Sequence, residues 1–407
     1  MTLAACLDVG STDTKLAVVD VGTGELVRAA THPTTAGTDV LDGVDALLEA
    51  AAAGGPVRHV YCCSSAGGGL RLAVIGQEAL VSADAAHRVA LSAGARVVHV
   101  AAGRQSPATL RAVRAARPDV LLLAGGTDGG ETGVLLHNAE RLAAARWRIP
   151  VVVAGNTDAR DAVTALLSAR GLPVTAAGNV LPSIGTVQPG PARAAIRAVF
   201  LSHVIGGKHL SKGPRFPRMV SAATPDAVLT GVGVLADALG GDLLVIDVGG
   251  ATTDVYSALV PDGTAGTAVA GTLWRARTVE GDLGVRWNTD GITAAAGNLP
   301  TGTALQLAAA ACVVAVRRHA RTGRDLRNVV SVVASGGVFR HAGPAAAVAA
   351  LTPMLHDHAG GWALPRAPRV TVDADYVLAA AGLLAAEHPH AAARLVRDHL
   401  LGAGHGP

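Results

Sequence analysis

Two glycine-rich turns in this chain each follow an apolar run that ends in an aspartate. The first reads DVGSTDTK from Asp8 to Lys15, and the second reads DVGGATTD from Asp247 to Asp254. A strand that ends in a carboxylate and turns through glycine into another strand has open backbone N–H groups at its tip. Such a tip can hold a phosphate, and the carboxylate can hold Mg²⁺ or orient a water. One turn of this kind is an ordinary hairpin. Two copies that share Asp, Val, Gly and Thr at the same spacing predict a cleft that grips a nucleotide triphosphate from both sides.

The elements around the two turns also repeat. After the first turn the pattern predicts a strand at Leu16–Val19, another at Glu25–Thr31, a helix at Asp39–Ala53 and a strand at Val57–Ser64. The predicted elements after the second turn are strands at Val255–Ala258 and around Gly271–Arg277, a helix at Thr303–Arg318 and a strand at Val329–Ala334. This shared order indicates an internal duplication.

The middle of the chain has a different rhythm. Helical stretches separate four short apolar runs, which are Val97–Ala101, Val120–Leu123, Val151–Ala154 and Val174–Ala177. Strand, helix, strand at this period predicts βαβ units and a small parallel sheet. The turn Gly125–Gly130 lies at the end of one run, where it could bind a ligand or serve only as a tight turn.

These patterns predict four parts of the chain. Helical material at Pro191–Ile205 and a Gly/Lys/Pro-rich linker at Gly206–Arg218 follow the parallel sheet. The predicted parts are the first lobe (1–94), an inserted α/β module (95–180), a closing helix and linker of the first lobe (181–218), and the second lobe with the second phosphate loop (219–407).

Composition excludes several classes of protein. The formal net charge of +3 is too small to indicate nucleic-acid binding. Arginines do cluster between Arg317 and Arg327, which we interpret as a solvated basic helix end rather than a phosphate-backbone patch. The longest uncharged apolar helix candidate, Leu305–Val316, is far shorter than the ~20 residues of a membrane span. Four cysteines without disulfide or metal spacing favour a reduced, cytoplasmic setting.

Several segments resemble the nucleotide-binding superfamily of actin, Hsp70 chaperones and sugar kinases. Asp8–Asp20 is similar to its first phosphate loop, Asp247–Ser257 to its second, Val332–Gly337 to its adenosine motif, and Asp375–Leu384 to its second connecting helix. The resemblance implies an α/β fold of two duplicated ribonuclease H-like lobes, here with the parallel α/β module inserted.

Within the superfamily, the chain resembles the glutamate mutase accessory proteins, the MutL/GlmL family, which is unrelated to the mismatch-repair MutL. The segments that carry this resemblance are Gly10–Lys15, Cys63–Leu70, Leu123–Gly130, Thr224–Val228 and Thr278–Gly284. The resemblance implies an ATPase-type partner of an adenosylcobalamin-dependent mutase, which expels damaged cobalamin from the inactivated enzyme. It also implies ATP or ADP and Mg²⁺ as ligands, and it leaves homo-oligomerisation open.

The resemblance assigns roles to individual residues. Asp8 and Asp247 are expected on either side of the Mg²⁺–phosphate group, holding the metal directly or through water, with Asp247 orienting the attacking water. The residues expected to contact the nucleotide are Gly10, Ser11, Thr12, Lys15, Gly249, Gly250, Thr252, Thr253, Gly336 and Gly337. Lys15 could be a phosphate counter-charge or point to solvent.

One departure from the superfamily pattern bears on hydrolysis. The superfamily usually has an acidic residue in its first connecting helix, but the chain has no Asp or Glu between Ser183 and Lys212. If that helix lies here, we expect slow hydrolysis. Two alternatives stay open: a scaffold that senses nucleotide without cleaving it, and a small-molecule kinase of the same fold.

Overall fold

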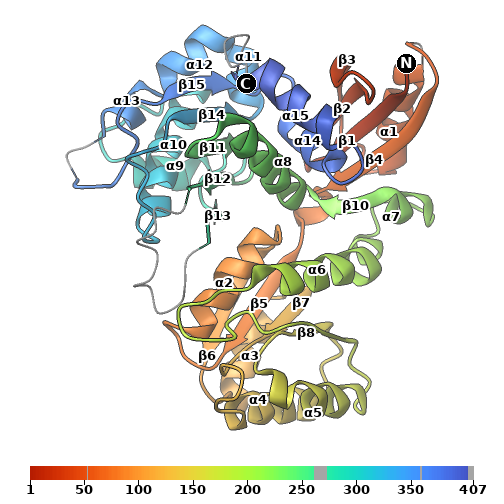
Figure 1. Cartoon of the computed structure of the whole chain (residues 1–407), viewed down its shortest axis with the longest axis vertical. Coiled ribbons are helices and arrows are strands. Elements are labelled where there is room, and N and C mark those ends of the chain that lie inside the picture. Colours follow the sequence, from red (N-terminus) through yellow and green to blue (C-terminus); the bar gives the residue numbers. More distant parts are fainter. Residues whose placement is uncertain (53, 261–272, 358–359, 402–407) are drawn as a thin grey trace.

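Three five-stranded sheets organise the chain (Figure 1). The computed structural model describes residues 1–52, 54–260, 273–357 and 360–401. Two of the sheets lie in the upper half of Figure 1 and the third forms the lower half. Within the described residues, no helix combines the length and the apolar character needed to cross a membrane.

The first sheet has the strand order β10-β4-β1-β2-β3. Strand β1 is antiparallel to β2, which is antiparallel to β3, whereas β4 and β10 run parallel to β1. Every residue of β1 is buried, as its uninterrupted apolar run predicts. The bounds are β1 Leu3–Val9, β2 Asp13–Asp20, β3 Glu25–Pro33, α1 Val40–Ala52, β4 Val57–Ser64, η1 Ala66–Gly68 and β10 Val220–Ala223.

The second sheet repeats this topology with the order β13-β12-β11-β14-β15. Its first three strands are antiparallel and its last two are parallel to β11, so each strand has a counterpart in the first sheet. The bounds are β11 Leu243–Val248, β12 Thr253–Ala258, β13 Arg275–Glu280, α9 Thr289–Ala296, α10 Ala304–Ala320, β14 Ser331–Ser335, α11 Gly337–Ala342, α12 Pro344–Ala350, α13 Thr352–Leu355 and β15 Arg369–Val372. The duplication and the two ribonuclease H-like lobes are therefore confirmed. Of the strand predicted around Gly271–Arg277, the first two residues lie outside the described ones.

In each lobe one helix follows the fifth strand of the sheet, and these two helices pack between the lobes. They are α8 (Thr224–Leu239), after β10, and α14 (Val377–Leu384), after β15. One buried cluster joins residues of both sheets to these two helices. A Cβ on Gly382 would lie 1.8 Å from the carbonyl oxygen of Ala227, and one on Gly231 would lie 2.0 Å from that of Leu378. The crossing therefore requires glycine at both positions. The chain then ends in α15 (Pro389–Val396) and η4 (Arg397–Leu401).

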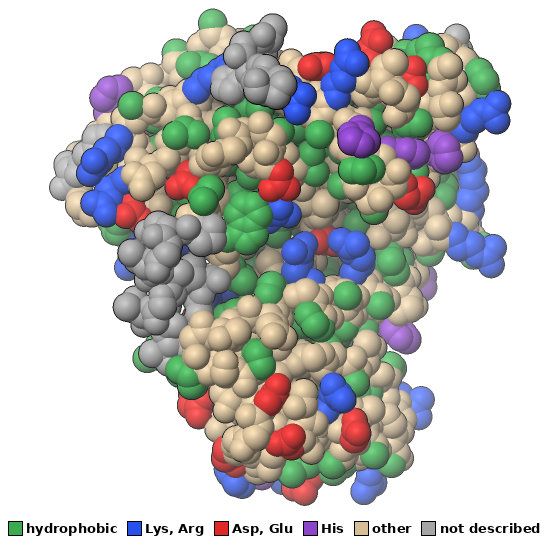
Figure 2. Space-filling model, viewed as in Figure 1, with side chains coloured by type: hydrophobic (Ala, Val, Ile, Leu, Met, Phe, Trp, Pro, Cys, Tyr) green, Lys and Arg blue, Asp and Glu red, His purple; other side chains and the backbone are tan. Residues whose placement is uncertain are grey.

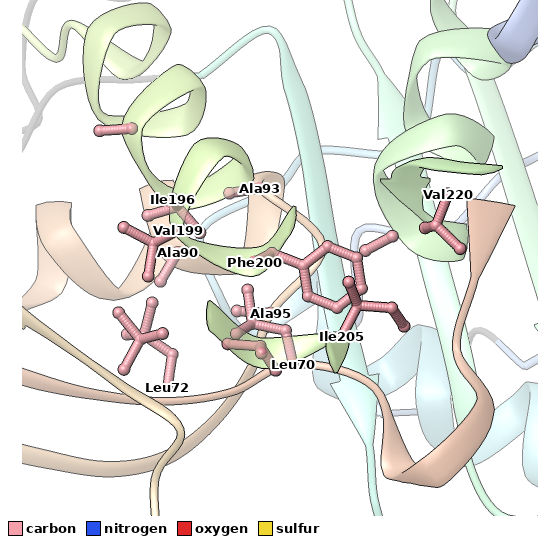
Figure 3. Packing of buried hydrophobic residues seen from close by; sticks show 14 of the residues in the cluster. Leu70, Leu72, Ala90, Ala93, Ala95, Ile196, Val199, Phe200, Ile205 and Val220 are labelled. Atoms are coloured by element: carbon pink, nitrogen blue, oxygen red, sulfur yellow. The ribbon is translucent and has the colours of Figure 1, made fainter. Parts of the chain in front are cut away.

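The third sheet is all parallel, with the order β6-β5-β7-β8-β9. Helices α2 and α6 cover one face, and α3, α4 and α5 cover the other. Figure 3 shows Ile196 and Val199 of α6 beside Ala90 of α2 and Leu72 of β5, with Phe200 and Ile205 extending the packing toward Val220 of the first sheet. The bounds are β5 Arg71–Gly76, α2 Ser82–Ser92, β6 Arg96–Ala102, α3 Pro107–Ala115, β7 Val120–Leu123, α4 Gly133–Ala144, β8 Val151–Val153, α5 Thr157–Ser168, β9 Val174–Ala176, α6 Pro189–Val199, η2 Phe200–Val204, η3 Gly206–Lys208 and α7 Arg215–Met219.

Two expectations about this region need correction. Strand β5 lies within the range predicted for the first lobe (1–94), but it pairs with β6 and β7 and so belongs to the third sheet. Helix α6 covers the third sheet, so the segment 183–212 does not supply the connecting helix. That place is taken by α8, which follows the fifth strand of the first sheet. The four-part domain division stays a prediction.

Candidate functional site

The two aspartate–glycine turns have the same geometry. In the first, the amide of Gly10 donates to the carbonyl oxygen of Asp13 at 3.1 Å, and in the second, that of Gly249 donates to the carbonyl oxygen of Thr252 at 2.9 Å. A Cβ on Gly10 would lie 2.8 Å from the Asp13 oxygen. A side chain there would force the turn open. The repeated sequence thus folds into a repeated hairpin tip.

The two tips face each other across the lobes. A Cβ on Gly250 would lie 3.6 Å from Oγ1 of Thr12. Among the described residues, the amides of Ser11, Thr12, Gly250 and Ala251 have no hydrogen-bond acceptor. Unpaired amides on two opposed tips are the groups that a polyphosphate needs.

The carbonyl groups of both tips accept hydrogen bonds from neighbouring segments. Thr34 donates through its amide to Thr12 and through its hydroxyl to Gly10. In the second tip, the amides of Arg286 and Trp287 both donate to the carbonyl of Gly250 at 2.9 Å. The remaining donors to this tip are the Val285 amide, to Gly249, and the Asn288 side chain, to Ala251. Fixing the carbonyls in this way leaves the amides available to an anion.

Asp8 is satisfied by the protein itself. Its Oδ2 lies 3.1 Å from Nζ of Lys15, and its Oδ1 accepts a 2.6 Å hydrogen bond from the hydroxyl of Thr224 at the start of α8. The thiol of Cys63, on the neighbouring strand β4, also donates to Oδ1. Asp8 is 6% exposed. This carboxylate therefore ties three elements of the first lobe together.

Lys15 points into the space between the lobes rather than to solvent. Burial lowers the pKa of its ammonium, but the charges of Asp8 and Asp247 outweigh burial and raise it above the ordinary value. The ammonium also lies 4.4 Å from the ring centre of Tyr376. Lys15 is thus a cation that is bound to the carboxylate of the first lobe and stabilised by the charge of the second lobe's Asp247.

Asp247 occupies the matching position in the second lobe. Its neighbour on β14 is Ser335, which donates a side-chain hydrogen bond to it as Cys63 does to Asp8. Burial raises the pKa of Asp247, and the nearby charges of Asp254 and Asp8 add to this effect, whereas Lys15 and Ser335 oppose it. A carboxylate with a raised pKa can accept a proton more readily than an ordinary one.

Sequence reasoning missed a third carboxylate, Asp373. It follows β15 as Thr224 follows β10, and its oxygens accept hydrogen bonds from the amides of Val377 and Leu378 at the start of α14. Burial raises its pKa to about 6, against the effect of those two amides, and the charge of Asp247 contributes. The duplication could have revealed this residue, because a polar residue ends the fifth strand in both lobes.

The remaining predicted residues divide into open and enclosed positions. Ser11 is exposed, and Thr252 is half-buried with its hydroxyl on Asp254. Thr253 is fully buried and its hydroxyl donates to the carbonyl of Leu283, so it supports the loop instead of facing a ligand.

The two glycines of the predicted adenosine motif also differ. Gly336 has a φ of 115°, and a Cβ on it would lie 2.2 Å from the carbonyl oxygen of Val248. It therefore serves the contact between β14 and β11. Gly337 is more open, since the nearest atom to a Cβ there is the hydroxyl of Tyr376 at 3.9 Å.

The carboxylates fit Mg²⁺ only together with a nucleotide. The described residues contain no group of three His, Cys, Asp or Glu side chains that could hold a metal alone. Mg²⁺ keeps several waters and is commonly bound by one or two carboxylates plus substrate phosphates. Asp247 suits that mode, whereas Asp8, the other predicted ligand, already accepts three hydrogen bonds from the protein.

Comparison with known families gives a match along nearly the whole chain. The family model described as MutL protein matches residues 4–300 and 301–400. A curated relative, "Protein MutL" of Clostridium tetanomorphum, is 32% identical over 458 aligned residues, which cover 97% of this chain and 98% of the relative.

Likeness to solved structures is distant. An ATP-dependent caprolactamase from Pseudomonas jessenii is 14% identical, with a TM-score of 0.38, over 86% of this chain and 67% of that one. A ROK family glucokinase from Streptomyces griseus, solved with glucose and AMPPNP, is 12% identical, with a TM-score of 0.34, over 93% and 98%. A nucleotide-free acetone carboxylase is 17% identical, with a TM-score of 0.34, over 69% of this chain, which spans about half of that chain (48%). The fold assignment itself rests on the matching strand orders of the two lobes.

Proposed function

Because the chain belongs to the MutL family of glutamate mutase accessory proteins, we propose that it is an ATP-binding reactivating factor for an adenosylcobalamin-dependent mutase. In this role it binds Mg-ATP between the lobes, hydrolyses it slowly and uses the change of state to release damaged cobalamin from the mutase.

The observation that carries the proposal is the pair of opposed hairpin tips with Lys15 between their carboxylates. The free amides of Ser11 and Thr12 would hold phosphate oxygens from one lobe, and those of Gly250 and Ala251 from the other. The Lys15 ammonium would then share its hydrogen bonds between Asp8 and the phosphate oxygens. Bound Mg²⁺ would neutralise further phosphate charge.

Hydrolysis in this site depends on the second lobe. Asp8 already accepts hydrogen bonds from Lys15, Thr224 and Cys63, so it has little capacity left for a water. Asp247 is the better candidate to orient the attacking water and take its proton, since burial has raised its pKa. As the water oxygen bonds to the γ-phosphorus, the bond to the bridging oxygen breaks and ADP leaves. A single oriented carboxylate is consistent with slow turnover, which suits a switch.

The crossing helices would convert nucleotide binding into movement. Helices α8 and α14 touch at Gly231 and Gly382. Helix α8 begins at Thr224, which bonds to Asp8, and the first amides of α14 donate to Asp373, which lies near Asp247. A ligand that draws the tips together would therefore act on the contact between the lobes. A ligand can shift such an equilibrium only by its differential affinity for the two states.

The decisive experiment uses a mutase blocked with cyanocobalamin. We expect the wild-type protein with Mg-ATP to release the corrin, and the Asp247→Asn variant to bind ATP but to lose hydrolysis and release. Asp161→Asn is the matched control, because the Asp161 side chain lies on α5, away from the two tips, and is 94% exposed. No release by the wild type, with any adenosylcobalamin mutase of the host, would contradict the proposal.

A nucleotide-sensing scaffold that does not cleave ATP is the second candidate. It is favoured by the full satisfaction of Asp8, which leaves only the second lobe's carboxylates for chemistry. The same assay separates the two, because a scaffold would release the corrin equally well with the non-hydrolysable analogue AMPPNP.

A further inference from the structure

Arg277 links the second lobe directly to the third sheet's helices. It lies on β13 and is 5% exposed. Its Nη1 donates to the carbonyl oxygens of Ala95 at 3.0 Å and Leu91 at 3.3 Å, at the C-terminal end of α2. Backbone carbonyls at a helix C-terminus carry partial negative charge, which favours a cation there. This arginine therefore holds the end of α2 against the second lobe.

The other side of the same guanidinium faces the second phosphate loop. Its Nε donates to Oδ1 of Asp254 at 2.8 Å. The second oxygen of Asp254 accepts a 3.2 Å hydrogen bond from the hydroxyl of Thr252, within the loop. Asp254 is also the antiparallel partner of Asp247 across β11 and β12. An unbroken chain of polar contacts thus runs from the phosphate loop to α2.

The end of α2 also touches the first lobe. Gly94 has a φ of 82°, and a Cβ on it would lie 2.9 Å from the amide nitrogen of Asp226 in α8. Asp226 is bound by Arg193 at 2.9 Å and Arg197 at 2.7 Å, both from α6. On the face drawn in Figure 2, blue and red side chains gather where the lower module meets the lobes above. The turn after α2 therefore contacts α8, whose first residue bonds to Asp8. It also contacts Arg277, whose partner Asp254 lies opposite Asp247.

Burying Arg277 and Asp254 is difficult to explain by stability alone. Two charges removed from water gain little over apolar residues of similar volume, whereas losing one partner is costly. Buried polar contacts of this kind are best attested where they specify one arrangement of the parts they join. Here the parts are the phosphate loop and the helical face of the third sheet.

We propose that Arg277 is a positioning residue that couples nucleotide at the second phosphate loop to the position of α2, and through α2 to the whole third sheet. The inference rests on the proposed nucleotide site. A phosphate on the loop recruits the Thr252 hydroxyl away from Asp254, so Asp254 accepts more from Arg277. The guanidinium then loosens its hold on the carbonyls of Leu91 and Ala95.

Hydrogen exchange with and without Mg-AMPPNP tests this coupling. The amides of Ala93 and Ala95 donate to carbonyls within α2, so their protection reports on the end of this helix. In the wild type we expect nucleotide to lower protection at residues 89–95. In the Arg277→Gln/Asp254→Asn variant, which removes both charges together, we expect AMPPNP to bind but this response to vanish. The affinity of this variant for AMPPNP should differ from that of the wild type by at most about 150-fold, the upper end of the usual range of allosteric coupling.

Two further variants make the test specific. Arg275→Gln is the matched control, because Arg275 lies on the same strand but pairs at 3.3 Å with Asp237, whose side chain is 66% exposed. It should keep the full response. Arg277→Lys keeps the charge but cannot contact Asp254 and the carbonyls as a fork, so it should weaken the response, and it decides the matter if the double variant does not fold.

The outcomes are distinguishable by calorimetry on the same samples. AMPPNP binding with an unresponsive α2 in the wild type, or a full response in Arg277→Lys or the double variant, overturns the coupling and leaves the nucleotide site standing. Absence of nucleotide binding in the wild type overturns both.

Discussion

The hydroxyl of Thr224 donates a 2.6 Å hydrogen bond to Oδ1 of Asp8, although the two residues are 216 positions apart. Thr224 begins α8 directly after the fifth strand of the first sheet. In the second lobe, Asp373 holds the same place after the fifth strand and lies near Asp247. The duplicated lobes therefore differ in chemistry at this position, with a neutral donor on one side and an acid on the other.

Replacing Thr224 by valine should destabilise the protein by about 1–3 kcal/mol, because a buried carboxylate oxygen loses its closest donor while the side-chain shape is kept. Thr230→Val is the control, since the Thr230 hydroxyl donates only to a carbonyl of its own helix. Urea unfolding of both variants measures the difference. Equal stabilities would show that the hydrogen bond to Asp8 contributes nothing.

Removal of the Lys15 ammonium should weaken ATP binding by about 10–100-fold, as expected for a charge-assisted hydrogen bond worth ~1.5–3 kcal/mol. Lys15→Met keeps the length of the side chain but leaves Asp8 and Asp247 without their shared cation. Calorimetry with ATP measures the effect. Lys212→Met, which removes an exposed lysine outside the site, should bind as the wild type does. If both variants bind equally, Lys15 has no contact with the phosphates.

The sequence was informative about the hairpin tips and much less so about what surrounds them. Both tips are local, so their residues are adjacent in the chain and their repetition is visible. The contact of Thr224 with Asp8 and the place of Asp373 near Asp247 were missed, because each residue follows a strand of only four residues, β10 or β15, at a sheet edge. Parallel pairing of such strands requires long connections, and the connection to β10 contains the entire third sheet. The same insertion led us to place the connecting helix at 183–212.

Trp287 should report nucleotide binding through its fluorescence. Trp287 is 65% exposed, and its amide donates to the carbonyl of Gly250 in the second aspartate–glycine turn, the proposed second phosphate loop. Arg286 lies over the ring at 4.9 Å. A phosphate at this loop should draw Arg286 from the ring and change the emission. We expect ATP to alter the emission of the wild type and of Trp147→Phe, in the loop between α4 and β8, but not that of Trp287→Phe. An ATP response retained in Trp287→Phe would place the nucleotide elsewhere.

The pKa of Asp373 predicts a specific pH dependence of stability. Its value of about 6 in the folded protein lies above the ordinary aspartate value of 3.8. As pH rises from 3.8 to 6, the unfolded chain therefore loses this proton first, and the folded state loses stability. A rise of this size corresponds to about 3 kcal/mol. Asp373→Asn lacks this loss, so its stability relative to the wild type should rise by about that amount between pH 4 and 7. Unfolding at both pH values measures it, and an equal difference at the two would refute the raised pKa.

The glycines at the crossing of α8 and α14 should be intolerant of even one methyl group. A Cβ on Gly382 would lie 1.8 Å from the Ala227 carbonyl oxygen, and one on Gly231 would lie 2.0 Å from that of Leu378. Both contacts are with backbone, which cannot move aside as a side chain can, so each Gly→Ala change must separate the helices. We expect each variant to lose about 1–3 kcal/mol or more, the usual cost of overpacking, and ATP affinity to fall because the helices begin beside the site aspartates. Gly190→Ala is the control: this α6 glycine has nothing within 4 Å of its Cβ position, and alanine should stabilise the helix by about 0.5–1 kcal/mol. Thermal unfolding measures these stabilities. If Gly382→Ala is as stable as the wild type, the lobes are not held together at this crossing.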